Sequence, residues 1–291
     1  MDRMSLGCEP LRNLPDDGFH LPLIKAHSLE KIRRHNYYAQ MFSTGMKSRW
    51  PQRAYLGLYC GAGRARIEGS GEVVETTAMS VCRLRDPFTK YIFVDNDSDC
   101  THALSKRIDA LPTKHDVAII PGDVNQILPE IRSELPAFSR TRGLISFCFV
   151  DPFAADLKFE TLRALGQYQM DFLILLMLGW DARVNFRRYL ENEDETRIAD
   201  LIDCPDWRQQ WRDRRKSGHR SVVHFLLGKF DEAMTRIGYR SAQPAHAHPV
   251  MIPSKRVLLY MLVLYSKHEL GQRFWEETLT HTDPQLGLVL D

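Results

Sequence analysis

Gly61 and Gly63 end a short apolar run and form a candidate ligand-binding turn. The apolar and aromatic side chains of residues 54–60 are typical of a buried strand. Glycine at both positions permits a tight turn and lets the backbone approach a nucleotide-like ligand closely. A Gly-x-Gly after a strand is a weak signal by itself, so its interpretation depends on the strands that follow.

Three later apolar runs, also predicted to be strands, end in an acidic residue. These strands and acids are 91–95 with Asp95, 117–120 with Asp123 after Gly122, and 144–150 with Asp151. The carboxyl ends of parallel strands lie along one edge of a sheet, where such sheets bind their ligands. We therefore expect the three carboxylates to line a cleft beside the glycine turn.

The turn and its acids favour an adenosine-containing cofactor. Either Asp95 or Asp97 could accept hydrogen bonds from ribose hydroxyls, although Asp97 could instead cap the following helix. Asp123 would lie beside the adenine, or would cap a helix over 124–135. The pattern lacks the second half of Gly-x-Gly-x-x-Gly and any Walker-type Gly-Lys-Ser/Thr, so S-adenosylmethionine (SAM), which needs no pyrophosphate cradle, fits best. The predicted cofactor-binding residues are Tyr59, Gly61, Gly63, Asp95, Asp97 and Asp123.

Asp151, Pro152 and Phe153 form the candidate catalytic motif. Amino-group methyltransferases place an acid or amide, prolines and an aromatic residue at this point of the chain. The acid accepts from the target amine, whose lone pair then points at the methyl group, and the aromatic ring stacks on the base. Here the aromatic residue is third and one proline is missing. The alternative is a strand-ending turn with Phe153 packed in the core.

Two basic segments are candidates for phosphate contact. The first is a helix predicted from Leu23 to about Arg49, with Ser28 as N-cap, which is either a solvated face or a surface that meets phosphates. In the second, at 207–220, tryptophans alternate with cations that could stack on bases and pair with phosphates. Alternatively, Trp207 and Trp211 form the buried stripe of a helix. The predicted nucleic-acid-binding residues are Arg208, Arg212, Arg214, Arg215 and Lys216.

Alternating strands and helices position these residues. Besides the four strands above, we expect a strand at 172–178, a loop at 64–71, helices at 75–85, 98–111, 124–135 and 158–167, a helical stretch at 180–237, closing strands at 239–242 and 256–265, and a helix at 270–279. Nearly all-apolar strands that alternate with helices indicate a parallel sheet covered on both faces. The closing pair, with Pro244, Pro249 and Pro253 in its link, predicts a hairpin with an antiparallel strand.

The expected fold class is therefore α/β, a Rossmann-like class I methyltransferase fold with a mostly parallel seven-stranded sheet, an antiparallel C-terminal hairpin strand and a helical insertion. We divide the chain into an N-terminal arm and basic helix (1–53), a methyltransferase-like domain (54–279) with its insertion (180–237), and a tail (280–291).

Composition favours a soluble, cytoplasmic protein. The six cysteines are scattered without a Cys-x-x-Cys pair, which favours a reducing setting. No signal core precedes the first domain, and the longest apolar stretches are too short to cross a bilayer. No metal site is expected, since no further ligand cluster adjoins His246 and His248 in sequence.

The chain resembles the three-Cys-motif partner protein (TcmP) family, whose members have a methyltransferase-like Rossmann fold. The resemblance covers about residues 23–279. It is carried by Tyr59–Arg64, Ile92–Asp95 with Asp97, Gly122–Asp123, Phe149–Phe153, Leu173–Asp181 with Asn185, Pro205–Trp207, and Leu259–His268 leading into Phe274–Trp275. It implies a bacterial or phage-associated protein that works beside a second gene product, a three-Cys-motif partner.

The chain departs from the family pattern at two places. The family usually carries an acid where this chain has Gly57, and in methyltransferases that acid helps to hold the methionine amino group. The family's Gly-Ser-Pro is also replaced here by Gly69-Ser70-Gly71. The leading hypothesis is a SAM-dependent methyltransferase that acts on nucleic acid within a mobile-element or phage-defence module. The alternative is a non-catalytic methyltransferase-like partner or nucleic-acid-binding subunit.

Overall fold

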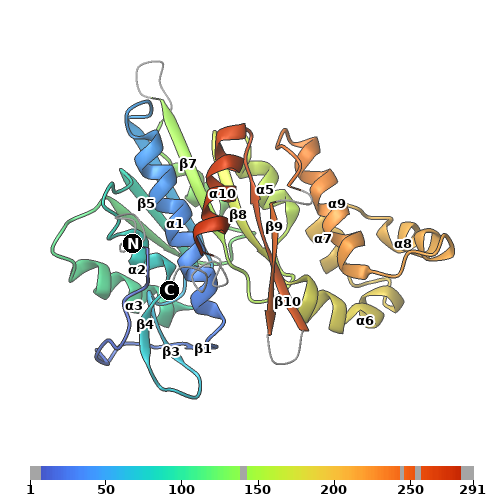
Figure 1. Cartoon of the computed structure of the whole chain (residues 1–291), viewed down its shortest axis with the longest axis horizontal. Helices are drawn as coiled ribbons and strands as arrows, with labels where there is room; N and C mark the ends of the chain where they lie inside the picture. Colours follow the sequence, from blue (N-terminus) through green and yellow to red (C-terminus); the bar gives the residue numbers. More distant parts are fainter. Residues whose placement is uncertain (1–7, 138–142, 243–245, 253–256, 283–291) are drawn as a thin grey trace.

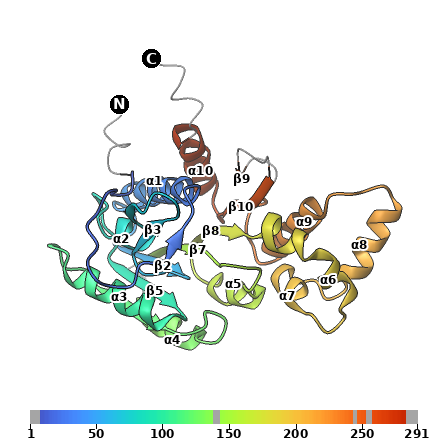
Figure 2. The same cartoon turned by 90° about the horizontal axis from the view of Figure 1, so that it is seen from below.

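A seven-stranded sheet forms the middle layer of the molecule (Figures 1 and 2). The computed structural model describes residues 8–137, 143–242, 246–252 and 257–282. In spatial order the strands are β6 (Val117–Pro121), β5 (Lys90–Asp95), β2 (Gln52–Leu58), β7 (Leu144–Val150), β8 (Met170–Leu176), β10 (Val257–Tyr265) and β9 (Ala247–Ile252). Parallel pairing joins β6 through β8, and β10 pairs antiparallel with both β8 and β9.

This topology confirms the predicted mostly parallel sheet with an antiparallel C-terminal strand. The chain runs from β2 outward to β5 and β6, then returns to the other side of β2 to form β7 and β8. Strand order therefore reverses at β2, and ligands of open α/β sheets bind at the carboxyl ends of the strands beside such a reversal.

Helices cover both faces of the sheet (Figure 2). One face packs in a core with α1 (Ser28–Met46), α2 (Thr77–Val81), α3 (Ser98–Asp109) and α10 (Glu269–Thr282). The opposite face packs in a second core with α4 (Leu128–Glu134), α5 (Phe159–Leu165), the π-helix η2 (Leu178–Ala182), α6 (Phe186–Glu191), α7 (Arg197–Ile202), α8 (Trp207–Lys216) and α9 (Val222–Arg236). Figure 1 shows α6–α9 extending beyond the β9 side of the sheet.

Residues 64–71 contain a strand, so the predicted loop is wrong. Arg64–Ile67 forms β3, which pairs antiparallel with β4 (Val73–Glu75) and parallel with β1 (Leu23–Ile24) in a separate three-stranded sheet. The alternating exposure of Arg64, Ala65, Arg66 and Ile67 is the period-two pattern of a half-buried strand. This small sheet fastens the N-terminal arm beside the glycine turn.

The predicted strand at 239–242 is also wrong. Tyr239 packs beneath β8, and its hydroxyl donates to the carbonyl of Met170 at 2.9 Å. The edge strand is instead β9, which contains Pro249 opposite Met261. An edge strand tolerates proline because one side of its backbone needs no ladder hydrogen bond. Pro244 and Pro253 lie outside the described residues.

Helix α1 begins at Ser28, but Ser28 is not its cap. The N-cap residue is His27, and no side chain caps the helix there. Four cations of the predicted basic face are held in ion pairs. These pairs are Lys31 with Asp151, Arg33 with Glu9, Arg34 with Glu30, and Lys47 with Asp86. Much of the basic face is thus occupied by the protein's own acids.

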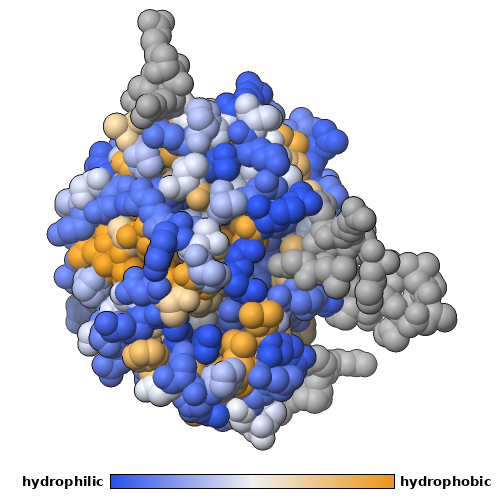
Figure 3. All heavy atoms as spheres, turned by 90° about the vertical axis from the view of Figure 1, so that its left-hand side faces the viewer, coloured by the Kyte–Doolittle hydropathy of each residue, from blue (hydrophilic) through white to orange (hydrophobic). Residues whose placement is uncertain are grey.

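In the part of the chain that the structure describes, no helix is both long and apolar enough to cross a membrane. Seen from the left-hand side of Figure 1, the molecule is mostly hydrophilic, with hydrophobic residues in separated patches (Figure 3). The large hydrophobic side chains that are exposed among the described residues are Leu11, Phe19, Leu23, Phe153, Val184 and Met251.

A buried acid at the start of β8, Asp171, makes the stability of the fold depend on pH. Burial raises the pKa of Asp171 to about 6, although hydrogen bonds from Ser266 and Tyr38 act in the opposite direction. The folded protein therefore binds this proton more tightly than the unfolded chain, and between pH ~4 and 6 the contribution of Asp171 to the free energy of unfolding should fall as pH rises.

Asp171→Asn should remove this fall, because asparagine does not titrate and still offers Tyr38 an acceptor. In urea denaturation at several pH values, the stability of the variant relative to the wild type should increase between pH ~4 and 6. The exposed residue Asp194 supplies the control Asp194→Asn, whose profile should run parallel to the wild type. Parallel profiles for both variants would contradict the role of Asp171.

Candidate functional site

The glycine turn lies where strand β2 ends. Three of its five residues have left-handed backbones: Tyr59 at φ 61°, Gly61 at 63° and Gly63 at 80°. A Cβ on Gly63 would lie 2.7 Å from both Leu104 and Met79, so only glycine fits against α2 and α3. A Cβ on Gly61 would meet nothing within 4 Å, and the backbone of Gly61 therefore faces open space.

Asp95 is bonded directly to this turn. Its Oδ2 accepts from the backbone N–H of Gly61 at 2.8 Å, and its Oδ1 accepts from that of Asp97 at 3.0 Å. Each oxygen retains a second lone pair, so the carboxylate can still accept from a ligand. Asp97 caps α3, since its Oδ1 accepts from the N–H groups of Asp99 and Cys100. Of its two possible roles, Asp97 therefore has that of helix cap. Asp95 remains the candidate for binding the ribose hydroxyls.

Asp123 lies at the end of β6, in the turn before α4. Its Oδ1 accepts from the N–H of Asn125 at 2.9 Å and its Oδ2 from the side chain of Gln126 at 3.0 Å. The alternative role as N-cap of a helix at 124–135 is wrong, because α4 begins at Leu128 and its N-cap is Ile127. The backbone N–H of Gly122 donates to the carbonyl of Asp95 at 2.8 Å, which joins this turn to the end of β5.

Tyr59 and Asn125 lie near Asp123. Burial raises the pKa of Tyr59, and the charge of Asp123 acts in the same direction, so its hydroxyl stays neutral. Asn125 donates to the carbonyl of Asp156 at 3.0 Å and accepts from the N–H of Lys158 at 2.9 Å. Sequence reasoning gave Asn125 no role, because its partners lie over 30 residues away.

Asp151, at the end of β7, forms an ion pair with Lys31 of α1. The ammonium donates to both carboxylate oxygens, at 2.8 and 2.7 Å, and both side chains are largely buried. The N–H of Asp151 donates to the carbonyl of Leu58 at 3.2 Å, which holds the motif beside β2. The sequence predicted Asp151 as an acceptor for the target amine, and the ion pair with Lys31, 120 residues away, was missed.

Phe153 is 90% exposed, so the alternative of a core-packed ring is wrong. Pro152 is buried, and the next part of the loop is anchored by Asp181 of η2. Oδ2 of Asp181 accepts from the N–H of Ala155 at 2.8 Å. The motif therefore presents one apolar ring to solvent from a loop that is fixed at both ends.

An aromatic cluster occupies the place of the missing acid. A Cβ on Gly57 would lie 3.0 Å from Phe93 and 3.2 Å from Tyr55. His35 completes the cluster, with its Nε2 2.8 Å from the Tyr55 hydroxyl, and burial lowers the pKa of His35 to about 3. The cluster is uncharged at neutral pH, and an acid at position 57 would have no room without a shift of these rings.

The structure places Trp207 and Trp211 in the core, 0% and 4% exposed. Their buried-stripe interpretation is confirmed, and the proposed stacking on bases is wrong for both. Arg208 donates to the carbonyls of Tyr189, Asn192 and Glu195, which is a structural role. The remaining predicted cations on α8 are exposed: Arg212, Arg214, Arg215 and Lys216.

The N-terminal arm borders the glycine turn through Arg107 of α3. This guanidinium is buried and donates to both carboxylate oxygens of Asp17 and to the carbonyls of His20 and Ala62. The sequence indicates no partner for the N-terminal arm, because nothing in its composition reveals a contact with α3. The four predicted strand ends are thus linked into one edge, with Lys31 and the arm beside it.

Among the comparisons with known proteins, matches come from solved structures. No protein-family model matches the chain, and no curated protein matches it. Among solved structures, an O-methyltransferase of Streptomyces achromogenes in complex with SAM is 11% identical, with a TM-score of 0.41 and coverage of 79% of each chain. An O-methyltransferase of Bacillus cereus in complex with SAH is 11% identical, with a TM-score of 0.39 and coverage of 79% of this chain and 80% of that one.

A third similar structure is the cyclopropane synthase MmaA2 of Mycobacterium tuberculosis. It is 10% identical, with a TM-score of 0.40 and coverage of 91% of this chain and 75% of that one. The order and directions of the strands define the class on their own: a Rossmann-like α/β protein with the class I methyltransferase sheet. The fold class predicted from the sequence is confirmed.

Proposed function

We propose that this protein is a SAM-dependent methyltransferase. The observation that carries the proposal is the hydrogen bond between the Gly61 N–H and Asp95, which joins a glycine turn to an acid at the point where strand order reverses. The open space at Gly61 leaves room for a ligand, and each oxygen of Asp95 keeps a second lone pair that could accept from it.

The residues at the carboxyl ends of the parallel strands would each bind or position part of SAM or of the acceptor. Gly61 and Gly63 let the backbone approach SAM, Asp95 accepts from its ribose hydroxyls, and Asp123 lies at its adenine end. When bound, SAM supplies an electrophilic methyl group. The protein's part is to align an acceptor at Asp151 with that group and to exclude water, which is how proximity lowers a barrier.

Lys31 restricts the acceptor chemistry at Asp151. An acceptor that donates to the carboxylate must share it with the ammonium of Lys31, less than 3 Å away. A protonated amine would be repelled there, whereas a neutral amine or a hydroxyl would not. Phe153, exposed beside this pair, offers a ring for stacking on a planar acceptor.

Calorimetry with SAM tests the function. We expect binding by the wild type and about tenfold weaker binding by Asp95→Ala, which loses a charge-assisted hydrogen bond. Asp99→Ala, a neighbouring exposed acid on α3, is the matched control and should bind as the wild type does. If millimolar SAM does not bind, or if Asp95→Ala and Asp99→Ala bind alike, the proposal fails.

A non-catalytic methyltransferase-like subunit is the alternative, and one observation favours it. Tyr55 and Phe93 fill the space where methyltransferases keep the acid that holds the methionine amino group. A protein that had lost its cofactor could fill the site in this way. The same calorimetry decides between the two functions, because only the enzyme needs SAM.

We further propose nucleic acid as the substrate, and a bacterial, cytoplasmic setting beside a three-Cys-motif partner. The exposed cations of α8 support the nucleic-acid part. Reversing Arg212, Arg214 and Arg215 to glutamate should weaken binding to nucleic acid and make it less dependent on salt. The slope of log binding constant against log salt concentration should become shallower by ~0.9 for each duplex phosphate that the protein no longer neutralises. Arg187→Glu, which lies on α6 and is 87% exposed, is the control. If the α8 charge-reversal variant keeps the affinity and the salt dependence of the wild type, α8 is not the nucleic-acid-binding surface.

A further inference from the structure

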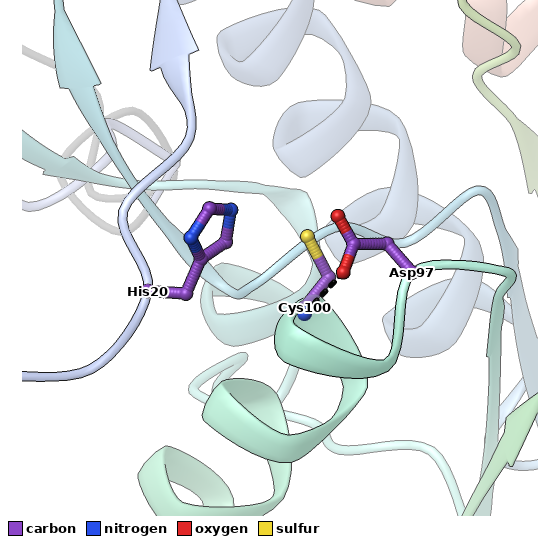
Figure 4. A group of neighbouring side chains, drawn as sticks. All are labelled: His20, Asp97 and Cys100. Atoms are coloured by element: carbon purple, nitrogen blue, oxygen red, sulfur yellow. Dashed lines mark hydrogen bonds between the residues drawn. The ribbon is translucent and has the colours of Figure 1, made fainter.

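A histidine, an aspartate and a cysteine meet where the N-terminal arm passes the start of α3. The side chains are those of His20, Asp97 and Cys100, and their ligand atoms all lie within 4.8 Å of one another. Figure 4 shows the sulfur of Cys100 and the carboxylate of Asp97 facing the imidazole of His20. These three residues form the only such group of three among the residues that the structure describes.

The geometry points to a binding site for a borderline divalent cation such as Zn²⁺, with His20, Asp97 and Cys100 as its protein ligands. Imidazole nitrogen, carboxylate oxygen and thiolate sulfur are the donors that Zn²⁺ takes in proteins. Three protein ligands leave a fourth tetrahedral position for solvent. The inference is independent of the proposed methyltransferase function.

Two of the ligands are already fixed in place. Oδ1 of Asp97 caps α3 through the N–H groups of Asp99 and Cys100, which sets the orientation of its carboxylate. The thiol of Cys100, in the first turn of the same helix, lies within 4.8 Å of the Asp97 carboxylate. On cation binding the thiol proton leaves to solvent, and a metal–thiolate bond takes its place.

The third ligand comes from the arm, and Arg107 holds it nearby. The guanidinium of Arg107 donates to the backbone carbonyl of His20 at 3.0 Å and to the carboxylate of Asp17. The His20 side chain is exposed, and no ring nitrogen of it has a hydrogen-bond partner within the described residues. On ion binding this exposed side chain would have to rotate so that the ligand atoms come to the ~3.5 Å separation expected around tetrahedral zinc.

Electrostatics favour a cation at this point. Asp95, Asp97 and Asp99 all lie close enough to act on the Cys100 sulfur. No arginine or lysine is ion-paired with any of these three carboxylates among the described residues. These three carboxylates attract a divalent ion to the start of α3.

Cobalt binding tests the site in the full chain, since a thiolate bound to Co²⁺ gives a charge-transfer absorption in the near ultraviolet. Metal-free, reduced protein should show this absorption at one equivalent of Co²⁺, and Zn²⁺ should displace it. Cys100→Ser should abolish the absorption, and His20→Ala should weaken Co²⁺ binding at least tenfold.

Cys204→Ser is the matched control. The Cys204 thiol also lies beside an aspartate, with its Sγ 3.3 Å from Asp206 Oδ1, but no group of three ligands surrounds it in the described chain. This variant should keep the absorption. His20 lies on the surface, so His20→Ala tests the site even if Cys100→Ser does not fold.

Limited proteolysis gives a second readout. Since the ion would tie the arm to α3, Zn²⁺ should slow cleavage within residues 8–22 of the wild type and leave the rate for His20→Ala unchanged. Absence of the charge-transfer absorption from the wild type would overturn the inference. So would its retention at full strength by either His20→Ala or Cys100→Ser.

Discussion

Asp181→Ala is expected to lower the free energy of unfolding by about 3 kcal/mol. The carboxylate is 8% exposed and accepts three hydrogen bonds, from the N–H of Ala155 at 2.8 Å, the side chain of Asn185 at 2.7 Å and the hydroxyl of Tyr189 at 2.9 Å. Alanine leaves these donors without their acceptor in a buried place. Because Ala155 belongs to the loop after Asp151, the variant should also loosen the candidate catalytic motif.

The contribution of Asp181 to the free energy of unfolding should depend on pH. Burial acts to raise the pKa of Asp181, but the hydrogen bonds from Ala155, Asn185 and Tyr189 outweigh it and hold the pKa below its usual value. A depressed folded pKa contributes stability that is present at neutral pH and is lost as pH falls through that pKa, below ~4. The difference in free energy of unfolding between the wild type and Asp181→Ala should therefore become smaller at acidic pH.

Urea denaturation at neutral and acidic pH measures both effects. Asp181→Asn, which keeps one acceptor oxygen, should fall between the wild type and alanine. Asp213→Ala removes an exposed acid from α8 and should change stability by less than ~0.5 kcal/mol. A loss from Asp181→Ala as small as that from Asp213→Ala would show that Asp181 does not anchor the loop.

The parallel strands of the large sheet could be predicted because each is a continuous apolar run with a clear end. Residues 144–150 match β7 at both ends, and the run at 91–95 starts one residue inside β5. The small sheet could not be predicted in this way. Its strand β3 has only four residues, and its pairing partner β1 lies some 40 residues earlier. Short strands take their stability from tertiary partners, which local sequence does not show.

The same reasoning separates the site residues that were predicted from those that were missed. Asp95, Asp123 and Asp151 follow directly from strands, so the topology alone brings them to one edge. Lys31 and Arg107 reach that edge from helices, and their partners lie 120 and 45 residues away. A basic residue in a helix is usually solvated, and only packing shows which one is aimed at an acid.

Arg107→Ala is expected to destabilise the fold by about 3 kcal/mol and to release the N-terminal arm. Arg107 is 4% exposed, and its fork pairs with both oxygens of Asp17, at 2.8 and 2.7 Å. It also donates to the carbonyl of Ala62 at 2.6 Å, within the glycine turn itself. Removal leaves these acceptors unpaired in a largely buried place, and cleavage within residues 8–22 should become faster in limited proteolysis.

Arg66→Ala is the matched control for this prediction. Arg66 pairs with Asp16, next to Asp17 in the arm, at 2.7 Å, but the two side chains are 36% and 55% exposed. An exposed pair of this kind contributes ~1 kcal/mol or less, and its loss should leave the arm in place. Arg107→Lys should rescue only part of the stability, because an ammonium cannot reproduce the two-pronged contact with the carboxylate. Equal losses from Arg107→Ala and Arg66→Ala would mean that burial of the guanidinium contributes nothing beyond its charge.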